Sequence, residues 1–205
     1  MKVISPSFQF EYEFDGEQLI ENIERYGRTC YKSEHRISKG TARSFITKIV
    51  LNGHESVLEH EKITVRVICD RGVSHEIVRH RIASYSQEST RYCNYALGNQ
   101  ICFIKPFFFD NRTEEYELWE KAMIACENVY LELIKKGAKP EEARAVLPNS
   151  LKTEIVITMN LREWRHFFKL RTDSHAHPQM KELTIPMLAE FKKKVPVVFD
   201  DILPE

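Results

Sequence analysis

Hydrophobic and polar residues follow two different periods along this chain of 205 residues. Alternation of apolar and polar positions predicts β-strands, and it occurs over residues 3–14, 63–70 and 153–159. Helical spacing of apolar positions predicts helices over 17–26, 38–52, 114–136, 141–147 and 161–170, and a last helix through Leu183 and Phe191 that Pro186 kinks. Asp70 is expected to cap a further helix that runs to about Ile82, before an irregular segment over 84–99 and a short apolar segment over 101–109.

The order of these elements favours an α+β fold. Strands and helices are mixed without regular strand-helix-strand alternation, so we expect a mainly antiparallel sheet packed with several helices. The longest helix, over 114–136, has an apolar face expected to point into the core, made of Trp119, Ala122, Met123, Cys126, Tyr130, Leu133 and Ile134. No repeat or Pro/Gly/Ser-rich linker interrupts the chain, which indicates a single domain over residues 1–205.

Composition excludes several classes of protein. Lys and Arg number 30 and Asp and Glu number 30, so the net charge of zero argues against a general nucleic-acid coat or a membrane-surface protein. No apolar run approaches the roughly 20 residues that cross a bilayer, and the first residues lack a signal peptide's apolar core. The five scattered cysteines form no C-x-x-C pair and indicate reduced thiols. We therefore expect a cytoplasmic protein that binds neither nucleic acid nor membrane.

Glycine is scarce, and this limits how the chain can bind phosphate. There are only 7 glycines, and no two lie close enough for a G-x-G-x-x-G or Walker loop. Any bound phosphate must therefore be held by side chains rather than by a glycine loop that exposes backbone N–H groups.

Two arginines fall on predicted apolar helix faces. On a helix over 73–82, Arg81 lies near the middle of the apolar arc. On the helix over 161–170, Arg171 lies at the centre of the apolar stripe, opposite the polar face formed by Arg162, Arg165, His166 and Lys169. A buried guanidinium needs a carboxylate, several carbonyls or a ligand anion. The alternatives are a buried salt bridge for Arg81, and snorkelling or an interaction with the helix dipole for Arg171.

The segment from Ser84 to Tyr92 is dense in hydroxyl groups and contains two aromatic residues. Hydroxyls and guanidinium groups suit phosphate oxygens, and a tyrosine can cover a flat heterocycle, so the segment suggests nucleotide binding. A polar surface loop is the alternative. Glu88 adds a carboxylate here and is expected either to pair with Arg91 or to weaken anion binding.

The sequence Arg79-His80-Arg81, followed after seven residues by Ser89, resembles the R-H-R-x7-S signature of flavin-dependent thymidylate synthases. Further segments resemble that family in order and spacing over about residues 53 to 177. They are Gly53-His54-Glu55-Ser56, Ser84-Tyr85, Arg91-Tyr92, Arg144-Ala145-Val146-Leu147-Pro148, and Asn160-Leu161-Arg162 through Trp164-Arg165-His166 to Leu170-Arg171.

This resemblance implies methylation of dUMP to dTMP, with methylenetetrahydrofolate as one-carbon donor, FAD as hydride carrier and NADPH as reductant. It implies a homotetramer whose active sites lie between subunits, and no metal. The implied flavin contacts are Ser56, Arg79, His80, Arg81, Gln87, Asn160, Leu161, Arg162 and His166. The implied dUMP site comprises Glu76, Ile77, Val78, Arg79, Gln87, Glu88, Ser89, Thr90, Arg91, Arg144 and Arg171.

The chemistry of such a reaction suits these residue types. Uracil is a weak nucleophile at its 5-position unless negative charge develops on the ring, and a fixed cation beside the ring stabilises that charge. Arg171 is the candidate for this catalytic role, which is electrostatic because arginine keeps its proton. Ser89 is expected to position the phosphate. No cysteine follows a proline, unlike the nucleophile of conventional thymidylate synthases.

Two other function classes remain as alternatives. A metal-dependent hydrolase would use His54 with His60, or His175 with His177, but no H-E-x-x-H or zinc-type cysteine spacing accompanies them. An RNA-binding module would use residues 79 to 95, but the net charge is zero and no RNA-binding signature is recognisable.

Overall fold

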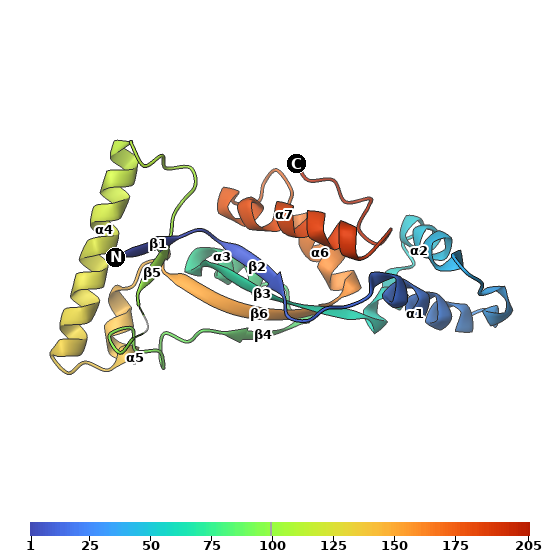
Figure 1. Cartoon of the computed structure of the whole chain (residues 1–205), viewed down its shortest axis with the longest axis horizontal. Coiled ribbons are helices and arrows are strands. Elements are labelled where there is room, and N and C mark those ends of the chain that lie inside the picture. Colours follow the sequence, from blue (N-terminus) through green and yellow to red (C-terminus); the bar gives the residue numbers. More distant parts are fainter. Residues whose placement is uncertain (99) are drawn as a thin grey trace. The chain divides into compact units, whose positions relative to one another are not determined.

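The computed structural model describes residues 1–98 and 100–205, and its helices and strands are labelled in Figure 1. The backbone is divided between two compact units. Unit 1 comprises Met1–Phe8, Arg66–Arg79 and Tyr85–Val156, and unit 2 comprises Gln9–Val65, His80–Ser84 and Ile157–Glu205. Asn99, the last residue of the segment predicted to be irregular, lies outside the described residues. A single domain over residues 1–205 stays a prediction.

The larger sheet has the strand order β2-β3-β6-β4 and is antiparallel. Its strands are β2 (Ser7–Phe10), β3 (Lys62–Asp70), β4 (Ala83–Gln87) and β6 (Lys152–Asn160). Buried and half-buried positions alternate along β3 and β6, as the period-two pattern predicts. The α+β class and both of these long strands are therefore confirmed.

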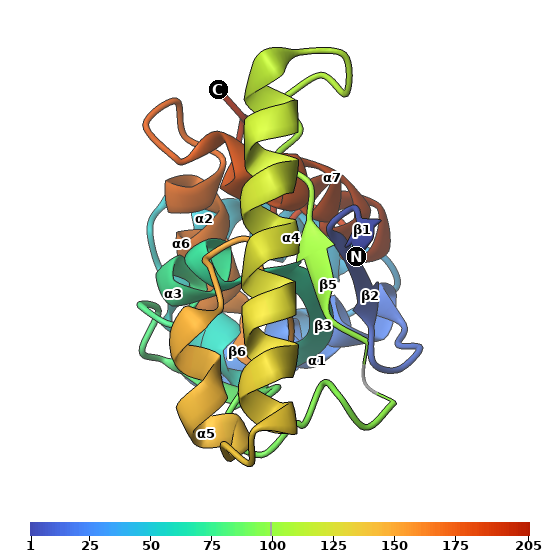
Figure 2. The same ribbon diagram turned by 90° about the vertical axis from the view of Figure 1, so that its left-hand side faces the viewer.

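Unit 1 contains a second, parallel pair of strands, β1 (Lys2–Ile4) and β5 (Cys102–Ile104). Its helices are α3 (Arg71–Ile77), α4 (Glu114–Lys135) and α5 (Pro140–Ala143), which continues into the short η3 (Arg144–Val146). Figure 2 shows the long α4 running past β5. Phe103 of β5 and Tyr130 of α4 share one buried apolar cluster.

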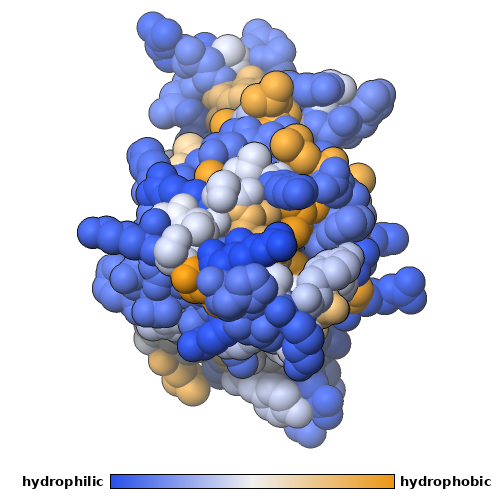
Figure 3. Space-filling model, turned by 90° about the vertical axis from the view of Figure 1, so that its right-hand side faces the viewer, coloured by the Kyte–Doolittle hydropathy of each residue, from blue (hydrophilic) through white to orange (hydrophobic). Residues whose placement is uncertain are grey.

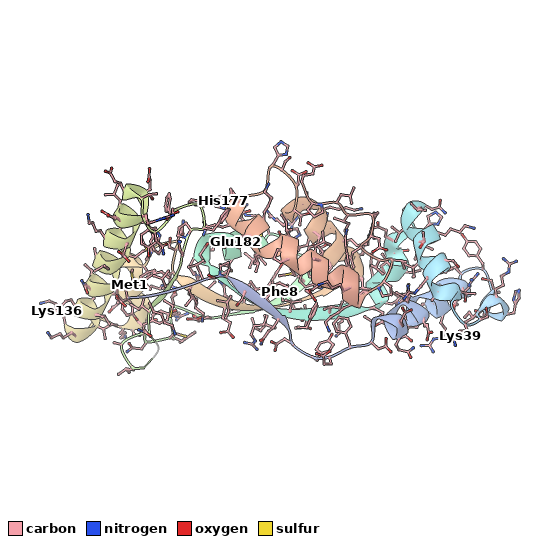
Figure 4. All side chains as sticks on the ribbon, turned by 45° about the horizontal axis from the view of Figure 1, so that its top comes forward. Met1, Phe8, Lys39, Lys136, His177 and Glu182 are labelled. Carbon is pink, nitrogen blue, oxygen red and sulfur yellow. The ribbon has the colours of Figure 1, made fainter. Side chains whose placement is uncertain are left out.

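The predicted long helix is confirmed, and its N-terminus is capped by the Thr113 hydroxyl, which accepts a hydrogen bond from the Tyr116 N–H. The Met1 ammonium lies 3.1 Å from the Glu127 carboxylate on α4 (Figure 4). Met123 and Tyr130 are buried as predicted, but Ala122 is exposed, so its placement in the core was wrong.

Unit 2 contains α1 (Gly16–Thr29), η1 (Glu34–Arg36), α2 (Thr41–Leu51), η2 (Glu55–His60), α6 (Leu161–Arg171) and α7 (Pro178–Lys194). Its core is aromatic, because Trp164, Phe168 and Phe191 pack on one another with ring centroids 4.9 to 5.7 Å apart. The Trp164 indole N–H donates to the Ile63 carbonyl at 3.0 Å, which fixes α6 against β3. The side that carries α1 and α2 is mostly hydrophilic, with apolar residues exposed in places (Figure 3).

Gly16 is the first residue of α1, and the backbone of Lys194 and Val195 lies very close to it. A Cβ at this position would lie 1.7 Å from the Lys194 carbonyl oxygen, so no side chain fits here. His177 precedes α7 (Figure 4), and its Nδ1 accepts from the Gln179 N–H, so the last helix begins at Pro178.

Three predictions about elements were wrong. The strand over 3–14 is two short strands, since Pro6, which has no N–H to donate, stands between them. The helix after Asp70 ends at Ile77 and does not reach Ile82. The segment over 84–99 begins as part of β4, because pairing with β6 overrides its turn-like composition.

The arginine predictions changed with these boundaries. Because α3 stops at Ile77, Arg81 lies beyond the helix and is exposed rather than directed inward. The buried arginine is Arg165, which was expected on the polar face of α6 and is only 1% exposed. Its guanidinium donates to Glu55 at 3.0 Å, to Asp201 at 2.6 Å and to the Val198 carbonyl.

We expect Arg165→Met to lower the free energy of unfolding by about 3 kcal/mol, because removal of one partner from a buried ion cluster leaves the others poorly solvated. Urea unfolding of the variant and the wild type measures this difference. Arg43→Met removes an exposed ion pair with Glu17 and serves as the matched control, for which little change is expected. If the two substitutions lowered the free energy of unfolding equally, the conclusion that the buried Arg165 cluster stabilises the fold would be contradicted.

The pH dependence of this difference follows from the same contact. Hydrogen bonds from Arg165 lower the pKa of Asp201. The contribution of ionised Asp201 to the free energy of unfolding is therefore complete above its unfolded pKa of about 3.9. It is lost as the pH falls through the lower pKa that Asp201 has in the folded state. The stability gap between wild type and Arg165→Met should shrink in acid.

Candidate functional site

Unit 2 contains a pocket of about 380 Å³ beside α6. Its lining residues are Glu55, Glu59, Ile82, Asn160, Arg162, His166 and Lys169. Arg162, His166 and Lys169 are spaced by four and three residues, so one face of α6 presents all three side chains. Asn160 caps this helix, since its side-chain oxygen accepts from the Glu163 N–H at 2.8 Å. The pocket thus joins three residues that the resemblance assigned to the flavin.

The cations of this pocket already face carboxylates. Arg162 donates to Glu59 at 2.5 Å, and the Lys169 ammonium lies 3.8 Å from Glu55. Both arginine and lysine side chains are about half exposed, so these pairs are weak and can exchange their partners for a ligand anion.

His80 lies behind this pocket in the core of unit 2 and is 4% exposed. Its ring packs edge to face on His166 and Phe167, with centroids 5.4 and 5.0 Å away. The Arg171 Nε–H donates to His80 Nε2 at 3.1 Å, and His80 Nδ1 lies 3.4 Å from a Glu163 carboxylate oxygen. Burial first, and then the nearby Arg171 and His166, lower the pKa of His80 to about 4, so the ring is neutral at physiological pH.

His80, Glu163 and His166 also satisfy a distance criterion for metal ligands. One ligand atom from each lies within 4.8 Å of the others, and among the described residues this is the group of three that comes so close. The histidine pairs that suggested a metal-dependent hydrolase are not part of it. A cation here would face Arg171, whose N–H already occupies His80 Nε2, so the group is better suited to hydrogen bonding than to metal binding.

Unit 1 contains a smaller pocket of about 240 Å³ lined by Arg71, His75, Thr90, Arg144, Ala145, Leu147, Pro148, Asn149 and Leu151. None of these lining residues is acidic, and three of them are basic or imidazole side chains. The Arg144 guanidinium reaches the Thr90 hydroxyl at 3.5 Å. Such a set of guanidinium and hydroxyl donors matches a phosphate group.

A second pocket of unit 1, of about 750 Å³, has Gln87 and Glu88 in its wall. Glu88 pairs with Lys152 at 2.7 Å and accepts a hydrogen bond from the Tyr95 hydroxyl at 2.7 Å. Of the two alternatives for Glu88, pairing with Arg91 is not observed, because Arg91 pairs with Glu141 instead, and an effect on anion binding stays a prediction.

The two predicted residue sets fall largely in different units. Most flavin residues lie in unit 2, namely Ser56, His80, Arg81, Asn160, Leu161, Arg162 and His166. The dUMP residues Glu76, Ile77, Val78, Arg79, Gln87, Glu88, Ser89, Thr90, Arg91 and Arg144 lie in unit 1, and Arg171 lies in unit 2. Ser56, Arg79 and Arg81 are exposed. Ile77 and Leu161 are fully buried, so neither residue offers surface to a ligand.

Sequence reasoning missed three basic residues that line these pockets, Arg71, His75 and Lys169. Arg71 donates to the Glu88 carbonyl at 3.3 Å and to the Thr153 hydroxyl at 3.4 Å. Arg71 and His75 are four residues apart on α3, and this spacing on one helix face was the available signal.

Comparison with known proteins places the chain in a family. Residues 14–197 match the family model described as thymidylate synthase complementing protein. A flavin-dependent thymidylate synthase of Pyrococcus furiosus is 39% identical over 184 residues, covering 89% of this chain and 73% of the relative. That of Geobacter sulfurreducens is 38% identical, covering 86% and 79%.

A solved structure has the same fold. The crystal structure of the UMP/dUMP methylase PolB from Streptomyces cacaoi, bound with 5-Br dUMP, matches with a TM-score of 0.82 and 22% identity and covers 98% of this chain and 96% of its own. The matched family model and the relatives above show that the chain belongs to the flavin-dependent thymidylate synthase family and is a methyltransferase.

Proposed function

We propose that this protein converts dUMP to dTMP, with methylenetetrahydrofolate as the one-carbon donor, FAD as hydride carrier and NADPH as reductant. The observation that carries the proposal is a pair of pockets, one in each unit, whose cationic and histidine side chains include residues of the two sets assigned by resemblance. No helix in the described part of the chain is both long and apolar enough to cross a membrane.

The pocket of unit 2 has the chemistry to bind part of a flavin dinucleotide. Arg162 and Lys169 offer cations to a diphosphate, and His166 offers an aromatic ring and ring nitrogens. When bound, the flavin supplies the hydride transfer, which side chains cannot perform. At about 380 Å³ the pocket is at the small end of the range for ligand sites, which favours a flavin shared with other residues or subunits. A homotetramer with shared active sites fits this requirement.

The pocket of unit 1 suits the phosphate of dUMP. Arg71 and Arg144 provide two guanidinium groups, and Thr90 provides a hydroxyl. A phosphate monoester carries close to two negative charges at neutral pH, so it gains from two cations that no acidic lining residue neutralises. Ser89 adjoins Thr90 and is assigned to the same positioning role.

Arg171 is assigned to the pyrimidine ring. The side chain is half-buried at the C-terminal end of α6, and its Nε–H is held by His80. A guanidinium fixed in this way can stabilise negative charge that develops on the ring as the 5-position attacks. No proton transfer is assigned to it. No step is assigned to a cysteine, and burial raises the pKa of the Cys69 thiol.

The first expected result is that the purified protein binds FAD. A visible absorption spectrum with flavin bands, and NADPH oxidation that yields dTMP when dUMP and methylenetetrahydrofolate are present, test this directly. A protein that takes up no FAD would contradict both the flavin site and the proposed reaction.

Arg171→Ala is expected to keep bound flavin and to lose dTMP formation by at least a hundredfold, because its charge acts on the pyrimidine alone. Flavin absorbance and product formation measure the two properties separately. Unchanged turnover would refute the assignment of Arg171.

Arg144→Ala is expected to weaken dUMP binding roughly tenfold or more, as is usual for a lost charge-assisted hydrogen bond. Calorimetric titration with dUMP gives the dissociation constant. Arg112→Ala removes the same charge from an exposed side chain of unit 1 outside the pocket, and its dUMP affinity should match the wild type. A similar loss in both variants would mean that only net charge matters.

A further inference from the structure

The Arg-His-Arg signature separates into two exposed arginines and one buried histidine. Arg79 and Arg81 are exposed, whereas His80 is packed among His166 and Phe167. His80 therefore contacts neighbouring side chains on two sides. Arg171 is at one ring nitrogen and Glu163 is at the other.

The contact with Arg171 determines where the proton of His80 lies. Arginine has N–H donors and no acceptor, so the His80 Nε2 atom, 3.1 Å from Arg171 Nε, must accept. A neutral imidazole carries one proton, which must then be on Nδ1. Nδ1 lies 3.4 Å from a Glu163 carboxylate oxygen, and although no hydrogen bond joins the two atoms, a carboxylate at this distance favours the proton on Nδ1 electrostatically.

We propose that Glu163 and His80 are positioning residues that hold the Arg171 guanidinium in place for the pyrimidine. The Glu163 carboxylate keeps the proton on His80 Nδ1, and this leaves Nε2 to accept the Arg171 Nε–H. The inference rests on the proposed function, in which Arg171 stabilises charge on the pyrimidine ring.

Three features of unit 2 suit this arrangement. Glu163 is 7% exposed and sits in the first turn of α6, which the Asn160 cap holds in register. Edge-to-face packing on Phe167 restricts rotation of the His80 ring. A neutral His80 also avoids placing a second cation beside Arg171, in agreement with its low pKa.

We call the contacts from Glu163 through His80 to Arg171 the relay. The relay gives the Arg171 side chain an orientation that helix geometry alone does not. Arginine side chains have many rotamers, and catalysis by a fixed charge requires that the guanidinium is ordered before the substrate binds. A hydrogen bond at Nε restricts the orientation of the guanidinium plane.

A matched pair of substitutions at Glu163 tests the relay in the flavin-loaded protein. Glu163→Leu removes the acceptor and is expected to raise the dUMP dissociation constant about tenfold, whereas Glu163→Gln keeps a side-chain oxygen and should stay within about twofold of the wild type. Both variants should retain FAD. Equal losses in the two variants, or loss of FAD instead of dUMP affinity, would overturn the proposal.

The same substitution in an Arg171→Lys background separates positioning from general damage. If Glu163 acts through Arg171, Glu163→Leu should have little further effect on dUMP affinity there, because lysine lacks the Nε–H that His80 accepts. A tenfold loss in both backgrounds would show that Glu163 acts independently.

A direct measurement of the tautomer distinguishes failure of the relay from failure of the proposed function. ¹⁵N spectra of histidine-labelled wild-type protein, assigned with His80→Gln, should show His80 protonated at Nδ1 and not at Nε2. A proton on Nε2 would overturn the relay whatever the activity. If the tautomer is as expected but no dTMP forms, the proposed function is contradicted, while the arrangement of Glu163, His80 and Arg171 is still supported.

Discussion

The buried charge of Arg165 is the constraint on which the arrangement of unit 2 depends. With 1% of its surface exposed, this guanidinium must be satisfied within the protein, and Glu55 of η2, Asp201 and the Val198 carbonyl satisfy it. These partners come from two segments far apart in the sequence, η2 and the C-terminal residues, so one side chain on α6 joins both of them. This joins α6 to the rest of unit 2, and α6 carries both the core and the candidate site.

The helix α6 distributes its polar side chains between three environments. Arg165 is paired in the interior, Arg162, His166 and Lys169 line the pocket, and Glu163 faces the buried His80. The apolar stripe headed by Trp164 fills the core between them. Arg165 and Glu163 need specific partners because burial removes water from them, whereas the half-exposed Arg162 and Lys169 form weaker pairs, and Glu55 serves both Arg165 and Lys169. The same helix can therefore be a core element and a binding surface.

A chain without glycine-rich loops must use side chains to bind the phosphate groups of a nucleotide. Arginine, lysine, histidine or threonine side chains are among the lining residues of both small pockets. The pocket of unit 1 has no acidic lining residue, whereas the pocket of unit 2 pairs its cations with Glu55 and Glu59. The first is suited to a group of high negative charge, and the second to a ligand that competes with weak surface ion pairs.

The sequence by itself determined the local elements with strong periods and the family. Strands β3 and β6 and helices α1, α4 and α6 follow from local periodicity, and the spacing from Arg79 to Ser89 identified the relatives. Only the tertiary structure decided which arginine is buried, where α3 ends, and that β4 is a strand. A helical wheel placed Arg165 on the polar face and Arg81 on the apolar one, and both placements were wrong. The reason is physical: burial of a charge is decided by partners such as Asp201 that are distant in sequence, and local spacing carries no information about them.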